Sequence, residues 1–424
     1  MSMHHATILG KAIKSAMKLR GGGSALPGLV VEKIDPDYIK NILSTLPKGV
    51  VVVSGTNGKT TTTKMIVELL EGQGLKVFTN RTGSNFTRGV AAALLGEVDF
   101  HGRLAADIAV LELDEAHAVH FVKAIQPSYS LLLNVMRDQL DRFGEIDATA
   151  QLLKTVASAT TKTVVVNRED PRLRNVASSL KDVDVAYFGL SDSLQSTFPT
   201  DDDMRTIAKS KNNSPNLPTL SVLESFDGKQ AVFTLAGKKL QAPLKLEGIY
   251  NIYNAAAALG LVASIIPQYN PVKLAESLAN VTPAFGRGEK IIVRGQPVDL
   301  VLVKNPAGFR LSLKSFPVSG ISTMIAINDN YADGRDMSWL WDVDFDSLRP
   351  TGVAMLSGVR AYDMAVRLQY EEVEVSHVVP NLGQGLRQFL GQQPSAPKRI
   401  YCTYTAMLAI RRELAKMTNV EVIS

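Results

Sequence analysis

The stretch Val50-Val51-Val52-Val53-Ser54-Gly55-Thr56-Asn57-Gly58-Lys59-Thr60-Thr61 decides the fold of this chain. The valines predict a buried strand, the glycines a turn, and the lysine and threonines the start of a helix whose apolar face continues through Met65 and Leu69. Strand, glycine turn and helix in this order indicate a phosphate-binding loop, because backbone N–H groups and a helix N-terminus attract anions. Lys59 would then reach the β- and γ-phosphates of a nucleotide, and the Thr60 hydroxyl would bind Mg²⁺.

The loop departs from the strict phosphate-loop pattern, whose first glycine would fall at Val53. The alternative is a glycine turn before a helix, with a solvated lysine. The order of strand, loop and helix favours the nucleotide site. We therefore expect Lys59 to be exposed to a ligand rather than packed.

Composition indicates a soluble globular protein of two or three domains. The chain has 424 residues, 45% of them apolar and 21% charged, and a formal net charge of +5. This mild charge, without a basic block that carries interleaved aromatic residues, argues against a nucleic-acid partner. The single cysteine, Cys402, excludes an internal disulfide and a cysteine metal site, and a reducing cytoplasm fits. No apolar stretch approaches a membrane span, and no signal-peptide core is present.

Alternation of apolar runs with helical segments predicts an α/β fold with a mostly parallel sheet. A boundary after Gly286-Arg287-Gly288-Glu289 divides the chain into domains 1–290 and 291–424. Residues 191–221 are polar and read as an exposed insertion or mobile loop. The strands expected in the first domain are 76–79, 109–113, 129–133, 163–166 and a short antiparallel pair at 232–235 and 240–246, followed by a helix at 254–265. Those expected in the second domain are 298–303, 323–327, 352–357, 373–379 and 399–403.

The N-terminus carries a basic amphipathic stretch, with Ile8, Leu9, Ile13 and Met17 on one helical face and lysines on the other. Such a helix would either rest on an anionic membrane surface or pack on its own domain. Packing is favoured.

Acidic and amide side chains follow two expected strands. Glu112 ends an apolar run and is placed to hold Mg²⁺ across from the phosphate loop; Asp114 and Glu115 are weaker candidates. The alternative is a solvated acidic cluster that caps the next helix. The polar segment 134–145 suggests a cleft at a strand end, or a salt-bridged surface loop.

Three further features have local explanations. Asn251 could cap a helix or contact the edge of adenine, and spacing alone does not separate these roles. The aspartate-rich segment 328–342 does not match a calcium-binding EF-hand loop, and its Trp339 and Trp341 read as core or interface residues. Cys402 lies in an apolar run and reads as a buried, inert thiol.

Taken together, these motifs resemble those of the Mur ligases, which join a carboxylate to an amine using ATP. More narrowly, the chain resembles the MurT family, the Mur-ligase-like subunits of lipid II isoglutaminyl synthases, from about residue 6 to 420. The broader resemblance rests on Gly55–Thr61, Glu112, Asn134 with Asp138-Gln139-Leu140-Asp141, Asn251 with Asn254, and Gly286-Arg287-Gly288-Glu289. The closer one rests on Gly83-Ser84-Asn85 with Gly89, Lys304-Asn305-Pro306-Ala307-Gly308-Phe309, and Asp336-Met337-Ser338-Trp339.

The resemblance implies a central ATPase domain with a phosphate loop and a mostly parallel sheet, plus a smaller C-terminal Rossmann-like α/β domain that contacts a glutaminase. It implies that ATP phosphorylates the α-carboxylate of D-glutamate in the lipid II stem peptide, and that ammonia then displaces phosphate to give D-isoglutamine. Thr60 and Glu112 would hold Mg²⁺, and Lys59 and Glu112 would be catalytic. The implied nucleotide-binding residues are Gly55, Thr56, Asn57, Gly58, Lys59, Thr60, Thr61, Asn254 at the adenine and Arg287 at the phosphates.

The resemblance also implies a partner. Ammonia would come from a GatD-type glutaminase, a class I glutamine amidotransferase, in a heterodimer; Asp336 would orient the partner's catalytic histidine. The enzyme would be cytoplasmic and work at the inner face of the cytoplasmic membrane, with peripheral contact to that surface.

Two departures from family patterns matter. Many MurT-like chains carry a four-cysteine zinc ribbon in the ATPase domain, but the corresponding stretch, 191–221, has no cysteine, so no zinc is expected. The early phosphate loop leaves no room for the UDP-binding domain of ordinary Mur ligases, which favours a lipid-linked substrate. The alternatives are an amino-acid-adding ligase of the Mur or folylpolyglutamate type, and a phosphate-loop switch or scaffold without ligase activity.

Overall fold

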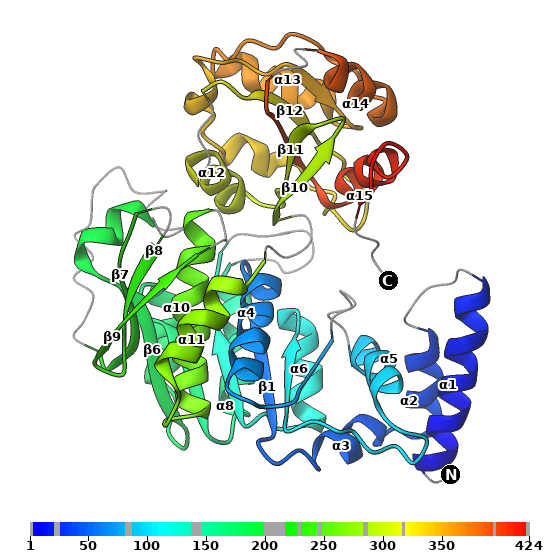
Figure 1. Cartoon of the computed structure of the whole chain (residues 1–424), viewed down its shortest axis with the longest axis vertical. Helices are drawn as coiled ribbons and strands as arrows, with labels where there is room; N and C mark the ends of the chain where they lie inside the picture. Colours follow the sequence, from blue (N-terminus) through cyan, green and yellow to red (C-terminus); the bar gives the residue numbers. More distant parts are fainter. Residues whose placement is uncertain are drawn as a thin grey trace.

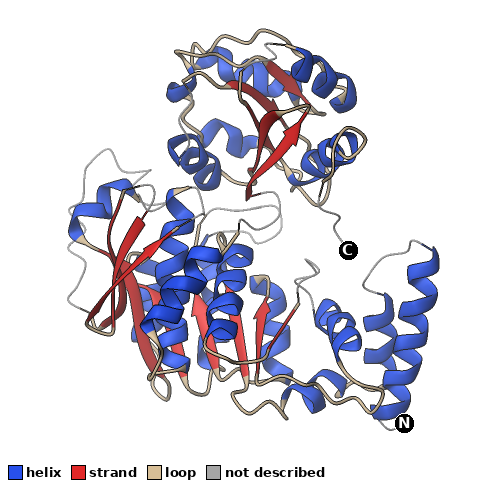
Figure 2. Cartoon of the chain, in the orientation of Figure 1, coloured by secondary structure: helices blue, strands red, loops and turns tan. Residues whose placement is uncertain are grey.

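The protein consists of two α/β units, each built on its own sheet (Figure 1). The computed structural model describes residues 3–20, 26–80, 87–136, 146–198, 217–227, 230–244, 248–282, 287–315, 319–392 and 396–420. Helices cover both faces of each sheet (Figure 2). This confirms the predicted fold class.

The larger sheet has nine strands in the order β2-β3-β1-β4-β5-β6-β7-β8-β9. The first seven of these are parallel, and β7, β8 and β9 form an antiparallel meander. Their bounds are β1 (Val50–Ser54), β2 (Val77–Thr79), β3 (Ile108–Glu112), β4 (Tyr129–Leu132), β5 (Thr163–Asn167), β6 (Asp184–Leu190), β7 (Thr219–Phe226), β8 (Gln230–Leu235) and β9 (Lys238–Pro243). The chain crosses over β1 between β3 and β4, so β1 lies at the topological switch point, where open α/β sheets bind ligands.

Alternate side chains of β1 enter two different cores. Val51 and Val53 pack under α4 (Lys59–Gly72), α10 (Ile249–Ile265) and α11 (Pro271–Asn280). Val50 and Val52 pack on the opposite face. Burial on both faces explains why this strand is a continuous run of valines. The helices of the opposite face are α2 (Leu26–Ile34), α3 (Tyr38–Leu43), α5 (Thr87–Glu97), α6 (Glu115–Ala124), α8 (Ile146–Ser158) and α9 (Pro171–Ser178).

The N-terminal helix α1 (Met3–Arg20) packs on α2 and α5, at the edge of the molecule far from the second unit (Figure 1). It packs through Ala6, Thr7 and Gly10, and leaves Ile8 and Leu9 more than two-fifths exposed. The helix is therefore packed on its own unit, as favoured, although Ile8 and Leu9 of its apolar face stay exposed. Among the helices of the described ranges, none has the length and apolar character needed to cross a bilayer.

The smaller sheet has five strands in the order β10-β11-β14-β12-β13. An antiparallel hairpin, β10 (Arg287–Val293) and β11 (Gln296–Leu302), joins the parallel strands β14 (Lys398–Cys402), β12 (Ser322–Ala326) and β13 (Met355–Ser357). One face is covered by α12 (Pro306–Ser315), α13 (Ala361–Tyr370) and the 3-10 turns η2 (Ser338–Asp342) and η3 (Asp346–Leu348). The other is covered by α14 (Leu382–Gly391) and α15 (Tyr404–Leu414).

Several element boundaries differ from the sequence prediction. β10 begins at Arg287, so the second sheet starts a few residues before the proposed boundary at 290. The predicted strand 373–379 is wrong: it makes only isolated bridges, Val353 to Val375 and Leu356 to Val378. Strands β6 and β7 were not predicted, and β7 begins inside the supposed insertion, which also contains η1 (Asp192–Thr197). Residues 199–216 lie outside the described ranges.

Candidate active site

The phosphate loop connects β1 to α4 and runs from Gly55 to Gly58. Gly55 has φ of 133° and Gly58 has φ of 88°, and residues other than glycine rarely adopt these backbone conformations. A Cβ at Gly58 would also lie 2.7 Å from Asn254 Oδ1, and one at Gly55 would lie 3.0 Å from the backbone of Asn134. Both glycines of the motif are thus required for the close approach of neighbouring segments, and the loop ends at the N-terminus of α4, where phosphate is favoured.

Lys59 is packed inside its own loop. Its Nζ donates to the Gly55 carbonyl at 2.5 Å and to the Thr56 carbonyl at 3.4 Å, and lies 3.5 Å from Glu115 Oε2. The residue is only 7% exposed, so the expectation of an exposed rather than packed lysine is wrong. The reason is that a buried ammonium needs acceptors, and two loop carbonyls and a carboxylate lie within reach.

Glu115 is the charge partner of Lys59 at the start of α6. Burial works to raise the pKa of its carboxyl, but the charge of Lys59, a backbone hydrogen bond and the charge of Lys304 together lower it below its usual value. Asp114, one residue before, caps α6 by accepting from Ala116 N at 3.3 Å. Asp114 therefore acts as a helix cap, as the alternative for the acidic cluster expected, whereas Glu115 forms an ion pair with the loop lysine, Lys59.

Thr60 and Glu112, the two predicted Mg²⁺ ligands, lie side by side. Thr60 Oγ1 donates to Glu112 Oε1 at 2.8 Å, and Glu112 is only 7% exposed. Asn80, which follows β2, pairs with the Glu112 backbone through both N–H and C=O, at 3.0 and 2.8 Å. The Thr60 hydroxyl in the first turn of α4 and the Glu112 carboxylate at the carboxyl end of β3 are oxygen ligands of the kind that a hard divalent cation prefers, so these residues fit Mg²⁺.

The segment after β4 forms hydrogen bonds with the phosphate loop. Asn134 accepts from Asn57 N at 2.8 Å and donates to Asn57 O at 3.0 Å, while its carbonyl accepts from Thr56 N at 3.0 Å. Thr56 Oγ1 in turn accepts from Met136 N at 3.0 Å. Asn134 therefore belongs to the site, as the sequence suggested. Asp138 to Asp141 and Gly83 to Asn85 lie outside the described residues.

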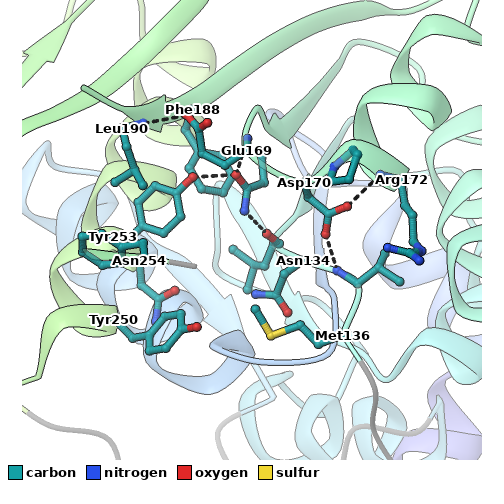
Figure 3. Close-up of a pocket in the computed structure, with 15 residues that line it drawn as sticks. Asn134, Met136, Glu169, Asp170, Arg172, Phe188, Leu190, Tyr250, Tyr253 and Asn254 are labelled. Atoms are coloured by element: carbon teal, nitrogen blue, oxygen red, sulfur yellow. Dashed lines mark hydrogen bonds between the residues drawn. The ribbon is translucent and has the colours of Figure 1, made fainter. Parts of the chain in front are cut away.

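An aromatic pocket lies beside the loop (Figure 3). Tyr250, Tyr253 and Asn254 of α10 line one side, and Asn134 and Met136 face them. The Tyr253 hydroxyl donates to Asn167 Oδ1 at 2.5 Å, and burial raises its pKa well above the usual value, so it acts as a neutral donor. The other lining residues are Leu133, Val135, Asn167, Glu169, Asp170, Pro171, Arg172, Phe188, Leu190 and Phe198. Aromatic rings beside the buried amide of Asn254 suit a planar, polar-edged group such as a nucleobase.

Asn251 does not cap α10. The helix begins at Ile249, after Gly248, so Asn251 lies inside its first turn, and the capping alternative is wrong. Asn251 lines a second pocket, between the two units, with Asn57, Thr61 and Asn254 from the larger unit and Lys304 and Ser312 from the smaller one.

The second unit contacts the loop through the turn between β11 and α12, which faces the larger unit (Figure 1). Lys304 Nζ donates to the Thr56 carbonyl at 3.0 Å, and the amide of Asn305 pairs with that of Asn57. Sequence reasoning gave these residues no role, because nothing local links positions 248 apart. Arg287 opens β10, but its side chain lies outside the described residues.

Asp336 lies in the second unit, in the segment between β12 and η2. It is exposed, and hydrogen bonds from the Ser338 side chain and backbone lower the pKa of its carboxyl. None of the contacts seen among the described residues joins it to the phosphate loop. Asp333 is instead structural: it is buried, and accepts from Thr405 N at 2.7 Å. Burial raises the pKa of the Cys402 thiol, which confirms an inert cysteine.

Comparison with known proteins agrees with this arrangement. The family described as Mur ligase middle domain matches residues 53–262, and MurT ligase C-terminal matches residues 302–407. The chain is 30% identical to the lipid II isoglutaminyl synthase (glutamine-hydrolyzing) subunit MurT of Streptococcus pneumoniae, over 96% of both chains. It is 28% identical to the subunit of the same name from Staphylococcus aureus strain COL, over 89% of both chains.

Solved structures show the fold. MurF from Acinetobacter baumannii superposes with a TM-score of 0.68 at 16% identity, covering 92% of this chain and 80% of MurF. MurF ligase from Thermotoga maritima in complex with ADP gives 0.67 at 17% identity, covering 92% and 85%. With a full-length relative at 30% identity and both family matches in chain order, the chain belongs to the MurT family of Mur-type ligases.

Proposed function

We propose that this chain is the ATP-dependent subunit of a lipid II isoglutaminyl synthase. It would amidate the α-carboxylate of D-glutamate in the lipid II stem peptide to D-isoglutamine. The observation that carries the proposal is the phosphate loop, with Thr60 against Glu112, in a chain that matches a MurT subunit over 96% of its length.

The proposed chemistry has two steps. A carboxylate oxygen attacks the γ-phosphorus of ATP, which forms an acyl phosphate and releases ADP. Ammonia then attacks the acyl carbon, the C–O bond to phosphate breaks, and inorganic phosphate and the amide are released. The acyl phosphate is needed because a carboxylate is a poor electrophile. Catalysis is then mainly alignment and charge neutralisation.

The loop residues divide this work. Backbone N–H groups from Gly55 to Thr61 and the Lys59 ammonium would hold the phosphates, once Lys59 leaves the Gly55 carbonyl. Thr60 and Glu112 would hold Mg²⁺, which supplies charge neutralisation when bound. The chain offers no cysteine between 191 and 221 for a zinc ribbon, so a zinc chelator should leave its melting temperature unchanged.

Asn254 would contact the adenine in the aromatic pocket. It is 7% exposed, and its amide lies against Gly58 of the loop, so a base in this pocket would be continuous with phosphates on the loop. Tyr250 and Phe198 would supply apolar ring surface. Arg287 would face the phosphates from the start of the second unit.

A GatD-type glutaminase would supply the ammonia. Glutamine hydrolysis needs an accessible thiolate, and the single cysteine of this chain is buried in β14. Asp336 is exposed and held as a carboxylate, which suits a group that orients a partner's histidine. Nearby, α13 exposes Tyr362, Val366 and Tyr370 along one stripe, a composition typical of protein interfaces.

The proposed lipid-linked substrate would place the enzyme at the inner face of the cytoplasmic membrane. The exposed Ile8 and Leu9 of α1 support peripheral contact with that surface.

The test is reconstitution. The chain is mixed with its glutaminase, ATP, Mg²⁺, glutamine and lipid II, and mass spectrometry follows replacement of one hydroxyl by an amine. Free ammonium should replace glutamine and the glutaminase. Product heavier by a whole amino acid would instead support an amino-acid-adding ligase. ATP binding without phosphate release, with lipid II and ammonium present, would support a switch or scaffold.

A further inference from the structure

Two ammonium groups from different units converge on one carbonyl of the phosphate loop. Thr56 O accepts from Lys59 Nζ at 3.4 Å and from Lys304 Nζ at 3.0 Å. Lys59 belongs to the first turn of α4, whereas Lys304 follows β11 in the smaller sheet. Like charges brought this close repel unless an anion lies between them.

The Glu115 carboxylate interacts with both lysines. Glu115 lies 3.5 Å from Lys59, and its carboxyl also feels the charge of Lys304. Lys59 also acts on the neighbouring Asp114, but burial and the charge of Glu115 raise the pKa of that carboxyl. The two lysines lie at the N-terminus of α4, whose dipole adds further positive potential. Such a cluster gains most from a multiply charged anion, and the loop lysine of this motif reaches the terminal phosphates of a nucleotide.

An amide pair fixes where Lys304 lies. Asn305 Nδ2 donates to Asn57 Oδ1 at 3.0 Å, and Asn57 Nδ2 donates to Asn305 Oδ1 at 3.3 Å. Asn305 is 1% exposed, and its Oδ1 also accepts from Gly308 N at 2.8 Å in the first turn of α12. That bond settles which way the Asn305 amide points, because only its oxygen can accept from an N–H.

Asn57 is held equally firmly from the other side. Its backbone N–H and C=O both bond the Asn134 amide, so only its side chain is left to reach the smaller unit. The amide pair therefore fixes how the two units lie at this point: Asn134 holds the backbone of Asn57 in place, and the first turn of α12 holds the side chain of Asn305. Lys304 directly precedes Asn305, so the same pair fixes the position of Lys304 at the loop.

We propose that Lys304 is a second cation for the terminal phosphate of ATP, and that Asn305 is the positioning residue that delivers it through Asn57. The inference rests on the proposed use of ATP and adds to it a contribution from the second unit. When ATP binds, Lys304 exchanges the Thr56 carbonyl for oxygens of the γ-phosphate, and remains beside that phosphorus as it passes to the acyl oxygen.

The first test measures nucleotide preference. The complex of this chain with its glutaminase is titrated by calorimetry with Mg²⁺ and either ADP or a non-hydrolysable ATP analogue. Lys304→Met should weaken binding of the ATP analogue about 10-fold or more, which corresponds to the loss of one charge-assisted hydrogen bond. Its affinity for ADP should change by less than about twofold, since the terminal phosphate is missing. Lys314→Met, which removes an exposed charge from the same unit, should leave both affinities unchanged.

An unchanged ratio of the two affinities in Lys304→Met would overturn the role of Lys304. Failure of the wild-type complex to bind either nucleotide would instead overturn the proposed function, so the two failures are distinguishable.

The second test separates positioning from structure. Asn305→Ala should lower the preference for the ATP analogue over ADP about as much as Lys304→Met, and should add less than about a twofold change in a Lys304→Met background, because its effect passes through Lys304. Asn305→Gln, which keeps the amide, should recover part of the preference. A full further loss in the double variant would show that Asn305 acts independently, and would contradict the proposal.

Discussion

Lys59 is the residue whose role changed most between sequence and structure. The motif predicts a lysine that waits for phosphate, but the side chain is buried against two carbonyls and Glu115. On the proposed role of Lys59, ATP would displace these contacts. The Thr60 to Glu112 contact, by contrast, was predictable, because the phosphate loop places Thr60 in the first turn after β1 and Glu112 ends the parallel neighbour strand β3.

Replacing Lys59 should affect both activity and stability. Lys59→Met should lower ATP turnover about 100-fold or more, as for loss of one preorganised donor. It should also lower the free energy of unfolding by about 3 kcal/mol, because the buried Glu115 loses its partner. Urea unfolding and phosphate release measure the two effects. Adding Glu115→Gln should recover stability but not turnover; a single variant as stable as wild type would mean that the ion pair contributes little.

The pair also predicts a pH dependence. Because the pKa of Glu115 is lowered in the folded protein, its ionised form contributes stability above the unfolded-state value of 4.5, and this is lost as pH falls through the folded pKa. Urea midpoints of wild type should therefore fall more steeply below about pH 4.5 than those of Glu115→Gln. Parallel curves for the two proteins would contradict the assignment.

At the scale of elements, apolar runs predicted most of the parallel strands, since buried β-branched runs have few alternatives. The antiparallel pair β8 and β9 was likewise predicted. The strand at 373–379 was wrong, because an alternating pattern cannot tell a strand from an extended segment that makes isolated bridges. The segment 248–254 was expected to open a helix with Asn251 as a possible cap, but α10 begins at Ile249, so Asn251 lies inside its first turn.

The segment that carries Asp336 makes a prediction about ammonia supply. Asp336→Asn should reduce glutamine-driven amidation about 100-fold or more, by loss of the group that orients the partner's histidine. It should leave the ammonium-fed reaction within about twofold of wild type, since no contact within the described part of the chain joins Asp336 to the loop. Initial rates with each nitrogen source provide the measurement, and Asp344→Asn, also exposed, is the matched control. Equal losses with both sources would make Asp336 a structural residue.

The stripe on α13 predicts the docking face of the glutaminase. Tyr362 and Tyr370 are 65% and 74% exposed, and they lie on the same face of the helix, about two turns apart. Tyr362→Asp should weaken binding of the glutaminase about 10-fold or more, as for an interface tyrosine. Val272→Asp on α11 of the larger unit, equally exposed, should not. Biolayer interferometry on the purified pair measures this, and identical affinities for the two variants would place the interface elsewhere.

At the scale of the whole molecule, the two units meet over the phosphate loop, and this is what the sequence could not supply. The α/β class of both units followed from local patterns. The Asn57 to Asn305 pair joins residues 248 apart, and the packing of Lys304 against Thr56 depends on how the units are arranged. The glycine-rich loop of a site shared between units can therefore be predicted from the sequence, but the contacts that the second unit makes with that loop cannot.

The central claim is that ATP held at the start of α4 activates a carboxylate for attack by nitrogen. The most direct test uses lipid II whose D-glutamate α-carboxylate carries heavy oxygen, incubated with the complex, ATP, Mg²⁺ and glutamine. Each amide formed should leave one labelled oxygen in inorganic phosphate, because that oxygen bridged the acyl carbon and phosphorus. Amide formation with unlabelled phosphate, or with no phosphate released, would contradict it.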